Sequence, residues 1–135
     1  SDSAFYLIRE AIREAIAVTM VPGATAFVPA LVLSGLATDT FVFEGFLPVK
    51  KGRRKRLQEL VEEKRTLIFY ESPRRLLKTL DEFLAYFGDR KVALVKELTK
   101  KFEQVYRGKI SQVRVELTEQ QPRGEWIIVL EGKGK

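Results

Sequence analysis

The sequence predicts an α/β domain in which helices cover a mixed, mostly buried β-sheet. Short apolar runs typical of buried strands, such as residues 66–70 and 91–98, are separated by predicted helices of about 10 to 15 residues. The chain has 135 residues, the size of one domain with a real core. It contains no internal repeat and no low-complexity tract.

The first third of the chain is predicted to contain two helices with a short strand between them. Residues 5–17 carry isoleucines at every fourth position opposite charged residues, which indicates an amphipathic helix. Residues 18–21 form a short β-rich run. Residues 24–36 are almost wholly apolar and predict a helix stopped at Gly35, with Pro29 near its first turn, where proline is tolerated.

The middle of the chain alternates strand and helix signals. Residues 40–47 alternate in a way that favours a strand or an extended segment, and a helix ending near Lys64 follows the basic run. Residues 66–70 form a buried strand. Ser72 and Pro73 then predict an N-cap followed by proline at the first helical position.

The last third has the most regular pattern. Leucine and phenylalanine side chains over residues 76–87 recur at spacings of one, three and four, and Gly88 is expected to end this helix. Residues 91–98 and 124–132 are predicted strands. Residues 104–117 are expected to form a short strand followed by a helix or an irregular segment.

Composition excludes several classes of chemistry. The chain has no cysteine and no histidine, which removes disulfides, thiolate and imidazole catalysis and the usual zinc and iron ligands. Its apolar runs are far shorter than the roughly 18 residues of a membrane span, and no signal segment opens the chain. We therefore expect a cytoplasmic protein with no metal and no membrane partner.

The basic charge is concentrated in one place. The net charge is +6, and the stretch "KKGRRKR" at residues 50–56 contributes six cations, so the rest of the chain is nearly neutral. Cations near a helix start are disfavoured by the macrodipole by roughly 0.3 to 1 kcal/mol each, so stability alone does not explain them. The run therefore predicts a polyanionic partner such as RNA, and a solvated basic turn is the alternative.

The end of the strand at residues 66–70 is a candidate ligand site. Tyr70 ends this strand and Glu71 and Ser72 follow it, and ligand crevices in α/β sheets lie off the carboxyl ends of strands. Arg74 and Arg75 could hold a phosphate or pair with a neighbouring glutamate. The alternative is an ordinary helix cap with solvated arginines.

Two further positions are weaker candidates. Glu97 and Glu125 lie near strand ends, as does Glu71, which allows a paired-carboxylate hydrolase but equally suits salt-bridged surface acids. Gly23 in "VPGATA" could bring the main chain close to a ligand, or could simply form a turn.

Several segments in one order resemble a known family. They are "VPGATAFVPALVLSGL", "FVFEGFLPVKKGRRKRLQEL", "TLIFYESPRRL", "VKELTKKFEQVYRG" and "GEWIIVLEG". Together they resemble the C-terminal part of the small-subunit ribosomal RNA methyltransferase I family, which are cytidine 2′-O-methyltransferases with a tetrapyrrole-methylase-like fold.

The resemblance implies a two-domain protein with S-adenosylmethionine between the domains, acting as a homodimer on 16S rRNA or the small ribosomal subunit. Residues 1–17 then correspond to the end of the N-terminal domain or a linker helix, and residues 18–135 to the C-terminal α/β domain. Ser3 and Ala4 replace a proline and a glycine of the family pattern. Because the N-terminal domain is missing, this chain alone is expected to be inactive.

The resemblance also implies roles for particular residues. The expected cofactor contacts are Tyr70, Glu71, Ser72, Pro22, Gly23 and Ala24. The expected RNA contacts are Lys50, Lys51, Arg53, Arg54, Lys55, Arg56, Arg74 and Arg75. The catalytic base is not identified, and Glu71, Glu97 and Lys100 are candidate orienting groups.

Two alternatives remain open from the sequence. The chain could be an RNA-binding α/β module without catalytic activity. It could also belong to a tetrapyrrole or diphthine type of methylase, although such substrates give no reason for six clustered cations.

Overall fold

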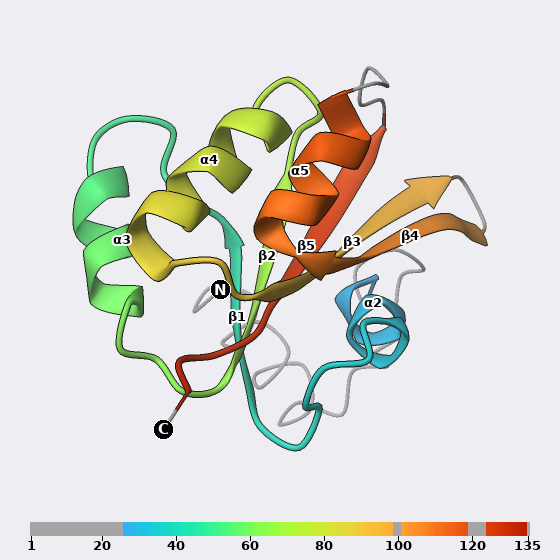
Figure 1. The fold of residues 1–135 in the computed structure, drawn as a ribbon, viewed down its shortest axis with the longest axis horizontal. Coiled ribbons are helices and arrows are strands. Elements are labelled where there is room, and N and C mark those ends of the chain that lie inside the picture. The colour runs from blue at the N-terminus through green and yellow to red at the C-terminus, as the bar shows by residue number, and fades with distance from the viewer. Residues whose placement is uncertain (1–25, 99–100, 119–123, 135) are drawn as a thin grey trace, which may run out of the picture.

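A computed structural model describes residues 26–98, 101–118 and 124–134, which form a five-stranded sheet with helices on both faces (Figure 1). The α/β class and the mixed sheet are thereby confirmed. The elements in chain order are α2 (Phe27–Leu33), β1 (Phe41–Phe46), α3 (Arg53–Leu60), β2 (Thr66–Glu71), α4 (Leu76–Phe87), β3 (Lys91–Leu98), β4 (Lys101–Lys109), α5 (Ile110–Thr118) and β5 (Glu125–Leu130).

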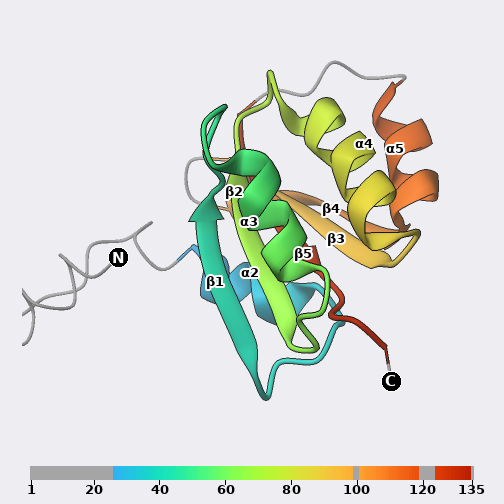
Figure 2. The ribbon, with the colours of Figure 1, turned by 90° about the vertical axis from the view of Figure 1, so that its left-hand side faces the viewer.

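The strand order is β1-β2-β5-β3-β4. β1 and β2 are parallel, β5 runs antiparallel between β2 and β3, and β3 pairs with β4 in antiparallel fashion. Figure 2 shows β1 at the near edge of the sheet. The carboxyl ends of β1, β2 and β3 therefore meet the start of β5 at one end of the sheet, which we call the Glu71 end.

The two faces of the sheet are covered differently (Figures 1 and 2). Helices α3, α4 and α5 pack on one face, here called the three-helix face, whereas α2 packs on the other, here called the α2 face. Successive residues of β2 and β5 alternate between the two clusters, as the period of a strand requires. Both strands are buried on both faces, which explains their continuous apolar runs.

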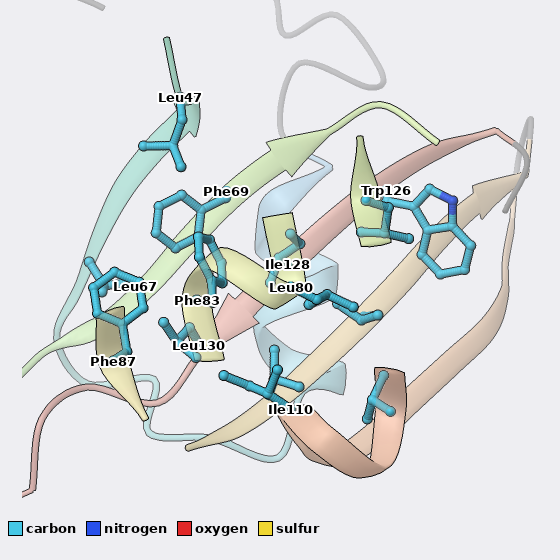
Figure 3. Packing of buried hydrophobic residues seen from close by; sticks show 14 of the residues in the cluster. Leu47, Leu67, Phe69, Leu80, Phe83, Phe87, Ile110, Trp126, Ile128 and Leu130 are labelled. Atoms are coloured by element: carbon cyan, nitrogen blue, oxygen red, sulfur yellow. The ribbon is translucent and has the colours of Figure 1, made fainter. Parts of the chain in front are cut away.

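The main core lies under α4 (Figure 3). Phe83 is fully buried, with its ring centroid 4.8 Å from that of Phe69 and 5.2 Å from that of Phe87. Each such buried side chain contributes roughly 1.5 to 3 kcal/mol by leaving water. The predicted helix over residues 76–87 is confirmed, and Gly88 ends it with a φ of 81° that favours glycine.

Most predicted elements are confirmed with small shifts at their ends. The helix predicted over residues 24–36 is α2, and Pro29 lies in its first turn. The segment at residues 104–117 forms the end of β4 followed by helix α5, so the helical alternative holds and the strand is longer than expected. Helix α3 ends at Leu60, earlier than the predicted Lys64.

The predicted cap at Ser72 is wrong. Helix α4 begins at Leu76, and the Arg75 N–H donates to the Ser72 carbonyl at 3.1 Å, which closes a turn before the helix. The reason is the Glu71 carboxylate, which accepts from the Ser72 N–H at 2.8 Å and from Arg75 Nε at 3.2 Å. A side chain from the strand therefore holds the turn, and the Ser72 hydroxyl does not cap α4.

Some predictions lie outside the described residues. These are the helix at residues 5–17, the strand at residues 18–21 and the domain boundary at residue 17. In the part of the chain that the structure does describe, no helix has the length and apolar character needed to cross a membrane.

Candidate functional site

Tyr70 and Glu71 point to opposite faces of the sheet because side chains alternate along a strand. Tyr70 is half-buried on the α2 face, where its ring lies 5.2 Å from that of Phe43 and 5.5 Å from that of Phe46, centroid to centroid. Glu71 is only 2% exposed and faces α3 and α4. Two residues predicted to share one ligand therefore present their side chains to different surroundings.

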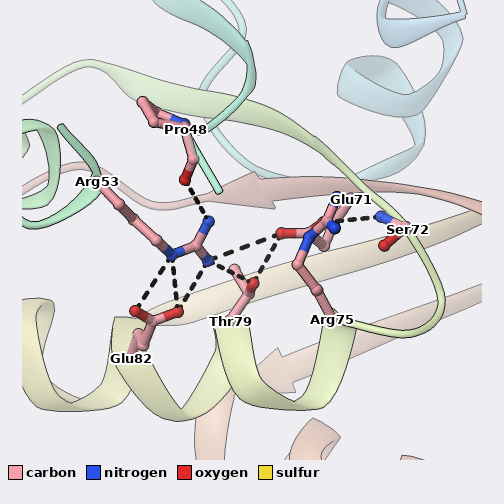
Figure 4. Close-up of polar contacts among 7 residues, drawn as sticks. All are labelled: Pro48, Arg53, Glu71, Ser72, Arg75, Thr79 and Glu82. Carbon is pink, nitrogen blue, oxygen red and sulfur yellow. Dashed lines mark hydrogen bonds and ion pairs between the residues drawn. The ribbon is translucent and has the colours of Figure 1, made fainter. Parts of the chain in front are cut away.

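The Glu71 carboxylate is fully occupied by neighbouring side chains and main chain (Figure 4). Besides the contacts with Ser72 and Arg75, Oε2 accepts from Thr79 Oγ1 at 2.7 Å and lies 3.8 Å from Arg53 Nη2. A buried carboxylate requires such partners, because isolated burial of a charge is costly. The Glu71 side chain is therefore built into the interior of the described part of the chain.

Arg53 is the second buried charge of this site, although the sequence predicts an RNA contact there. Its side chain is buried, with Nε donating to both Glu82 oxygens at 3.1 and 3.2 Å and Nη2 donating to Thr79 Oγ1 at 2.8 Å. Nη1 donates to the Pro48 carbonyl at 2.9 Å. We call Arg53, Glu71, Thr79 and Glu82 the buried polar cluster.

The cluster corrects part of the argument from the basic run. Arg53 is the first residue of α3, a position that the helix dipole disfavours for a cation. Two carboxylates compensate it there, because Glu71 and Glu82 both lie within ion-pair distance of its guanidinium. The position of Arg53 at the start of α3 is therefore explained by ion pairs that stabilise the fold, which the sequence did not reveal.

Arg56 is also engaged within the protein. Its Nε donates to Glu44 Oε2 at 2.9 Å, its Nη2 forms an ion pair with the same carboxylate, and its Nη1 donates to Glu59 at 2.8 Å. Hydrogen bonding to Glu44, and then to Glu59, raises the pKa of the Arg56 guanidinium above its ordinary value. The ion pair ties α3 to β1.

The remaining cations of the run face solvent. Lys50, Lys51, Arg54 and Lys55 are exposed, and we call them the exposed basic patch. Lys50 and Arg54 line a shallow hollow of about 500 Å³ together with Tyr86 and Glu82 of α4. Arg74 is exposed as well, whereas Arg75 forms an ion pair with Glu71.

Among the described residues, two buried polar atoms at the Glu71 end have no hydrogen-bond partner. They are Ser72 Oγ and Trp126 Nε1, and Trp126 lies directly across from Glu71 in the pairing of β2 with β5. Buried polar groups nearly always have partners, so these two mark hydrogen-bonding capacity that the described residues leave unused. Ser72 Oγ is therefore free, among the described residues, to form a hydrogen bond, whereas the Glu71 carboxylate already has several partners.

Trp126 is a residue that sequence reasoning missed. Within "GEWIIVLEG" it looks like one more buried side chain of a strand, and it does pack in the main core. No local signal shows that its N–H lacks an acceptor among the described residues, because this depends on its neighbours in the folded chain.

The other predicted site residues are only partly covered by the structure. Pro22, Gly23, Ala24 and Lys100 lie outside the described residues. The backbone of Glu97 pairs with Glu125, whose side chain is exposed. Within the described ranges, no group of three or more acidic side chains is placed to hold a metal ion.

The fold is that of a methylase domain. The structure of cobalt precorrin-4 methyltransferase, a cobalamin biosynthetic enzyme, matches 94% of this chain with a TM-score of 0.61 at 19% identity, over 57% of its own length. Uroporphyrin III C-methyltransferase from Thermus thermophilus matches 92% with a TM-score of 0.51 at 20% identity, over 55% of its length. The chain belongs to the family Tetrapyrrole (Corrin/Porphyrin) Methylases, whose model matches residues 1–114.

Much closer relatives are named ribosomal RNA small subunit methyltransferase I. The protein of Thermotoga maritima is 43% identical over 98% of this chain, and that of Halalkalibacterium halodurans is 46% identical over 100%. The protein of Haemophilus influenzae is 44% identical, also over 100%. The chain spans 60%, 47% and 49% of these relatives, or about half of their length. The predicted resemblance is confirmed.

Proposed function

We propose that this chain is part of an enzyme that transfers a methyl group from S-adenosylmethionine to the 2′-hydroxyl of a cytidine in 16S rRNA. The observation that carries the proposal is the identity of 43% to 46%, over nearly the whole chain, to relatives named as rRNA methyltransferases. Neither tetrapyrrole methylase structure exceeds 20% identity, so those structures support the fold and not the substrate.

The cofactor side of the site is assigned to Tyr70 and Ser72. S-adenosylmethionine supplies an electrophilic methyl group on a sulfonium. The partly buried Tyr70 ring offers an apolar surface, and the Ser72 hydroxyl, which has no partner among the described residues, offers a hydrogen bond. Glu71 acts through its neighbours, because its carboxylate fixes the Ser72 N–H and the turn that follows.

The RNA side is assigned to the exposed basic patch and Arg74. These cations have their charged groups in solvent, where phosphates can reach them, and phosphate contacts supply most of the affinity of such interfaces. Arg53 supports this surface from within, and the partly exposed Arg56 and Arg75 are held beside it by their ion pairs. The proposal thus retains five of the eight cations predicted from the sequence as direct contacts.

The chemistry requires positioning more than reactive side chains. The ribose oxygen forms a bond to the methyl carbon as the sulfur–carbon bond breaks, and the hydroxyl proton leaves to a base. Glu71 is unsuited to be this base, since its carboxylate is enclosed by the buried polar cluster. Glu97 and Lys100 remain predictions, as do the homodimer, the cytoplasmic location and the partner N-terminal domain.

The proposal is tested with the full-length protein. Calorimetry should detect S-adenosylmethionine binding, and mass spectrometry of small-subunit rRNA should detect a 2′-O-methylated cytidine. RNA binding without cofactor binding would favour the non-catalytic module. Cofactor binding with methylation of a tetrapyrrole or a protein, and not of RNA, would overturn the substrate.

A charge-matched pair of variants tests the RNA surface. Replacing Lys50 and Lys51 with Ala should weaken RNA binding and lower the slope of log K against log salt by about 0.7 to 0.9 for each phosphate that the protein no longer neutralises. Replacing Lys91 and Lys109 with Ala removes the same charge at the other end of the sheet and should leave the slope nearly unchanged. Equal effects from both pairs would show a diffuse charge effect and no defined surface.

A further inference from the structure

The α2 face carries an exposed aromatic row along β1. Phe41, Phe43 and Phe46 are 38%, 41% and 55% exposed, and their rings form a chain of contacts with Phe27 and Tyr70. Large apolar side chains gathered at a surface commonly mark an interaction site. Phe46 is the most exposed ring of the row, and it lies at the Glu71 end.

A β-bulge directs Phe46 to this face. In a regular strand, residues three apart point to opposite faces, so Phe43 and Phe46 would be separated. The register with β2 shifts between Phe43 and Gly45, and Gly45 adopts a φ of 66°, which side chains disfavour. As a result both rings contact Tyr70. Bulges frequently serve to re-aim a side chain near a functional site.

Phe46 also connects the two parts of the proposed site along the chain. On one side its ring contacts that of Tyr70, the residue assigned to the cofactor. On the other side the chain continues through buried Leu47 to the exposed basic patch, and Arg53 anchors this connection through the Pro48 carbonyl. An exposed aromatic ring, followed four residues later in the chain by clustered exposed cations, supplies the two groups that bind unpaired nucleotides, by base stacking and phosphate contact together.

We propose that Phe46 is a stacking platform for an unpaired nucleobase of the RNA substrate. The inference rests on the proposed function and deepens it, because it adds a single-stranded requirement and names a positioning residue. The base stacks on the exposed ring while the exposed basic patch holds the adjoining phosphates. The exposed cations that begin four residues after Phe46 in the chain favour RNA over an apolar protein partner as its occupant.

The experiment compares Phe46→Ala, Phe46→Leu and Phe46→Trp in the full-length protein, using a single-stranded RNA oligonucleotide and the same sequence as a duplex. Phe46→Ala should weaken binding of the single strand by about 5- to 150-fold, the range for loss of one stacked base, with little change for the duplex. Phe46→Leu should not restore binding, whereas Phe46→Trp should. Phe41→Ala, at the far end of the same strand, is the matched control and should bind like wild type.

Tryptophan fluorescence gives a readout that needs no catalysis. Within this chain the one tryptophan, Trp126, is buried, so the difference in emission between Phe46→Trp and wild type reports on the surface position. Single-stranded RNA should quench this added emission. Unchanged RNA affinity in Phe46→Ala, rescue by Leu, or loss of dimer instead of RNA binding would each overturn the proposal. RNA binding by wild type without methyl transfer would instead count against the proposed function alone.

Discussion

At the Glu71 end, the two faces of the sheet place two consecutive residues, Tyr70 and Glu71, in different surroundings. On the three-helix face, Glu71 is enclosed with Arg53 and Thr79 in a network of hydrogen bonds. On the α2 face, Tyr70 lies among aromatic rings that remain partly in solvent. One strand end thus separates an enclosed carboxylate from a partly exposed ring simply by alternation of its side chains.

The basic run shows the same division along a helix. Arg53 lies in the interior, whereas the next residue, Arg54, is exposed. Adjacent positions on a helix point about 100° apart, so a run of identical charges can serve two purposes. In a cluster of cations, those on the interior side of a helix should therefore be separated from those on its solvent side before the charge is assigned to a binding partner.

The largest expected effect comes from removing Arg53, which tests whether this cation is structural and its neighbour Arg54 is not. Arg53→Ala should lower the free energy of unfolding by roughly 3 to 5 kcal/mol, because Glu71 and Glu82 are then left without their buried partner. Urea denaturation measures the change. The matched variant Arg54→Ala should stay within about 0.5 kcal/mol of wild type, and equal losses from both would contradict the division.

A smaller loss is expected from the hydroxyl at the centre of the cluster. Thr79→Val keeps the shape of the side chain but removes one hydrogen bond from Arg53 and one to Glu71. Each bond to a charged group contributes about 1.5 to 3 kcal/mol. Because Arg53 and Glu71 keep their other partners, the free energy of unfolding should decrease by about the amount of one such bond. If Val is tolerated without cost, the cluster is not holding α3 against α4.

A substitution in the exposed aromatic row of the α2 face should lower the free energy of unfolding less than the same substitution in the main core. Phe43→Ala removes ring contacts with Phe27 and Tyr70, yet Phe43 is already 41% exposed. We expect a loss of about 1 kcal/mol in thermal or urea unfolding. The same substitution at fully buried Phe83 should cost about 3 to 5 kcal/mol, and similar costs at the two sites would show that the α2 face is a core.

The smallest effect concerns an ion pair at the surface. Hydrogen bonds from the Arg65 side chain, and then from its N–H, lower the pKa of Glu63 to about 2 from its ordinary 4.5. A lowered pKa stabilises the fold above pH 4.5, and this contribution disappears as the pH falls through about 2. Solvent screening keeps it below about 0.5 kcal/mol.

The comparison for this ion pair is Glu63→Gln across the acid range. The variant should be slightly less stable than wild type near neutral pH and equal to it near pH 2. A difference that grows on acidification would have the wrong sign for a lowered pKa.

Local patterns predicted the elements well, and they failed where the hydrogen-bond partners of a side chain depend on the folded structure. The helix at residues 76–87 and the strand at residues 91–98 follow from spacing and from Gly88. The Ser72 cap failed because the Glu71 carboxylate takes the Ser72 N–H and Arg75 Nε. The N–H of Trp126, unused among the described residues, had no sequence signal at all.

The sequence by itself determined the α/β class, the resemblance to the family and the concentration of charge, since each depends on local order along the chain. Only the tertiary structure decided that Arg53 is interior and that Phe46 shares a face with Tyr70. The first depends on Thr79 and Glu82, which lie 26 and 29 residues away in the chain. The second depends on a one-residue shift of register between two strands. Contacts between distant residues and pairing register both arise from packing, which no local pattern encodes.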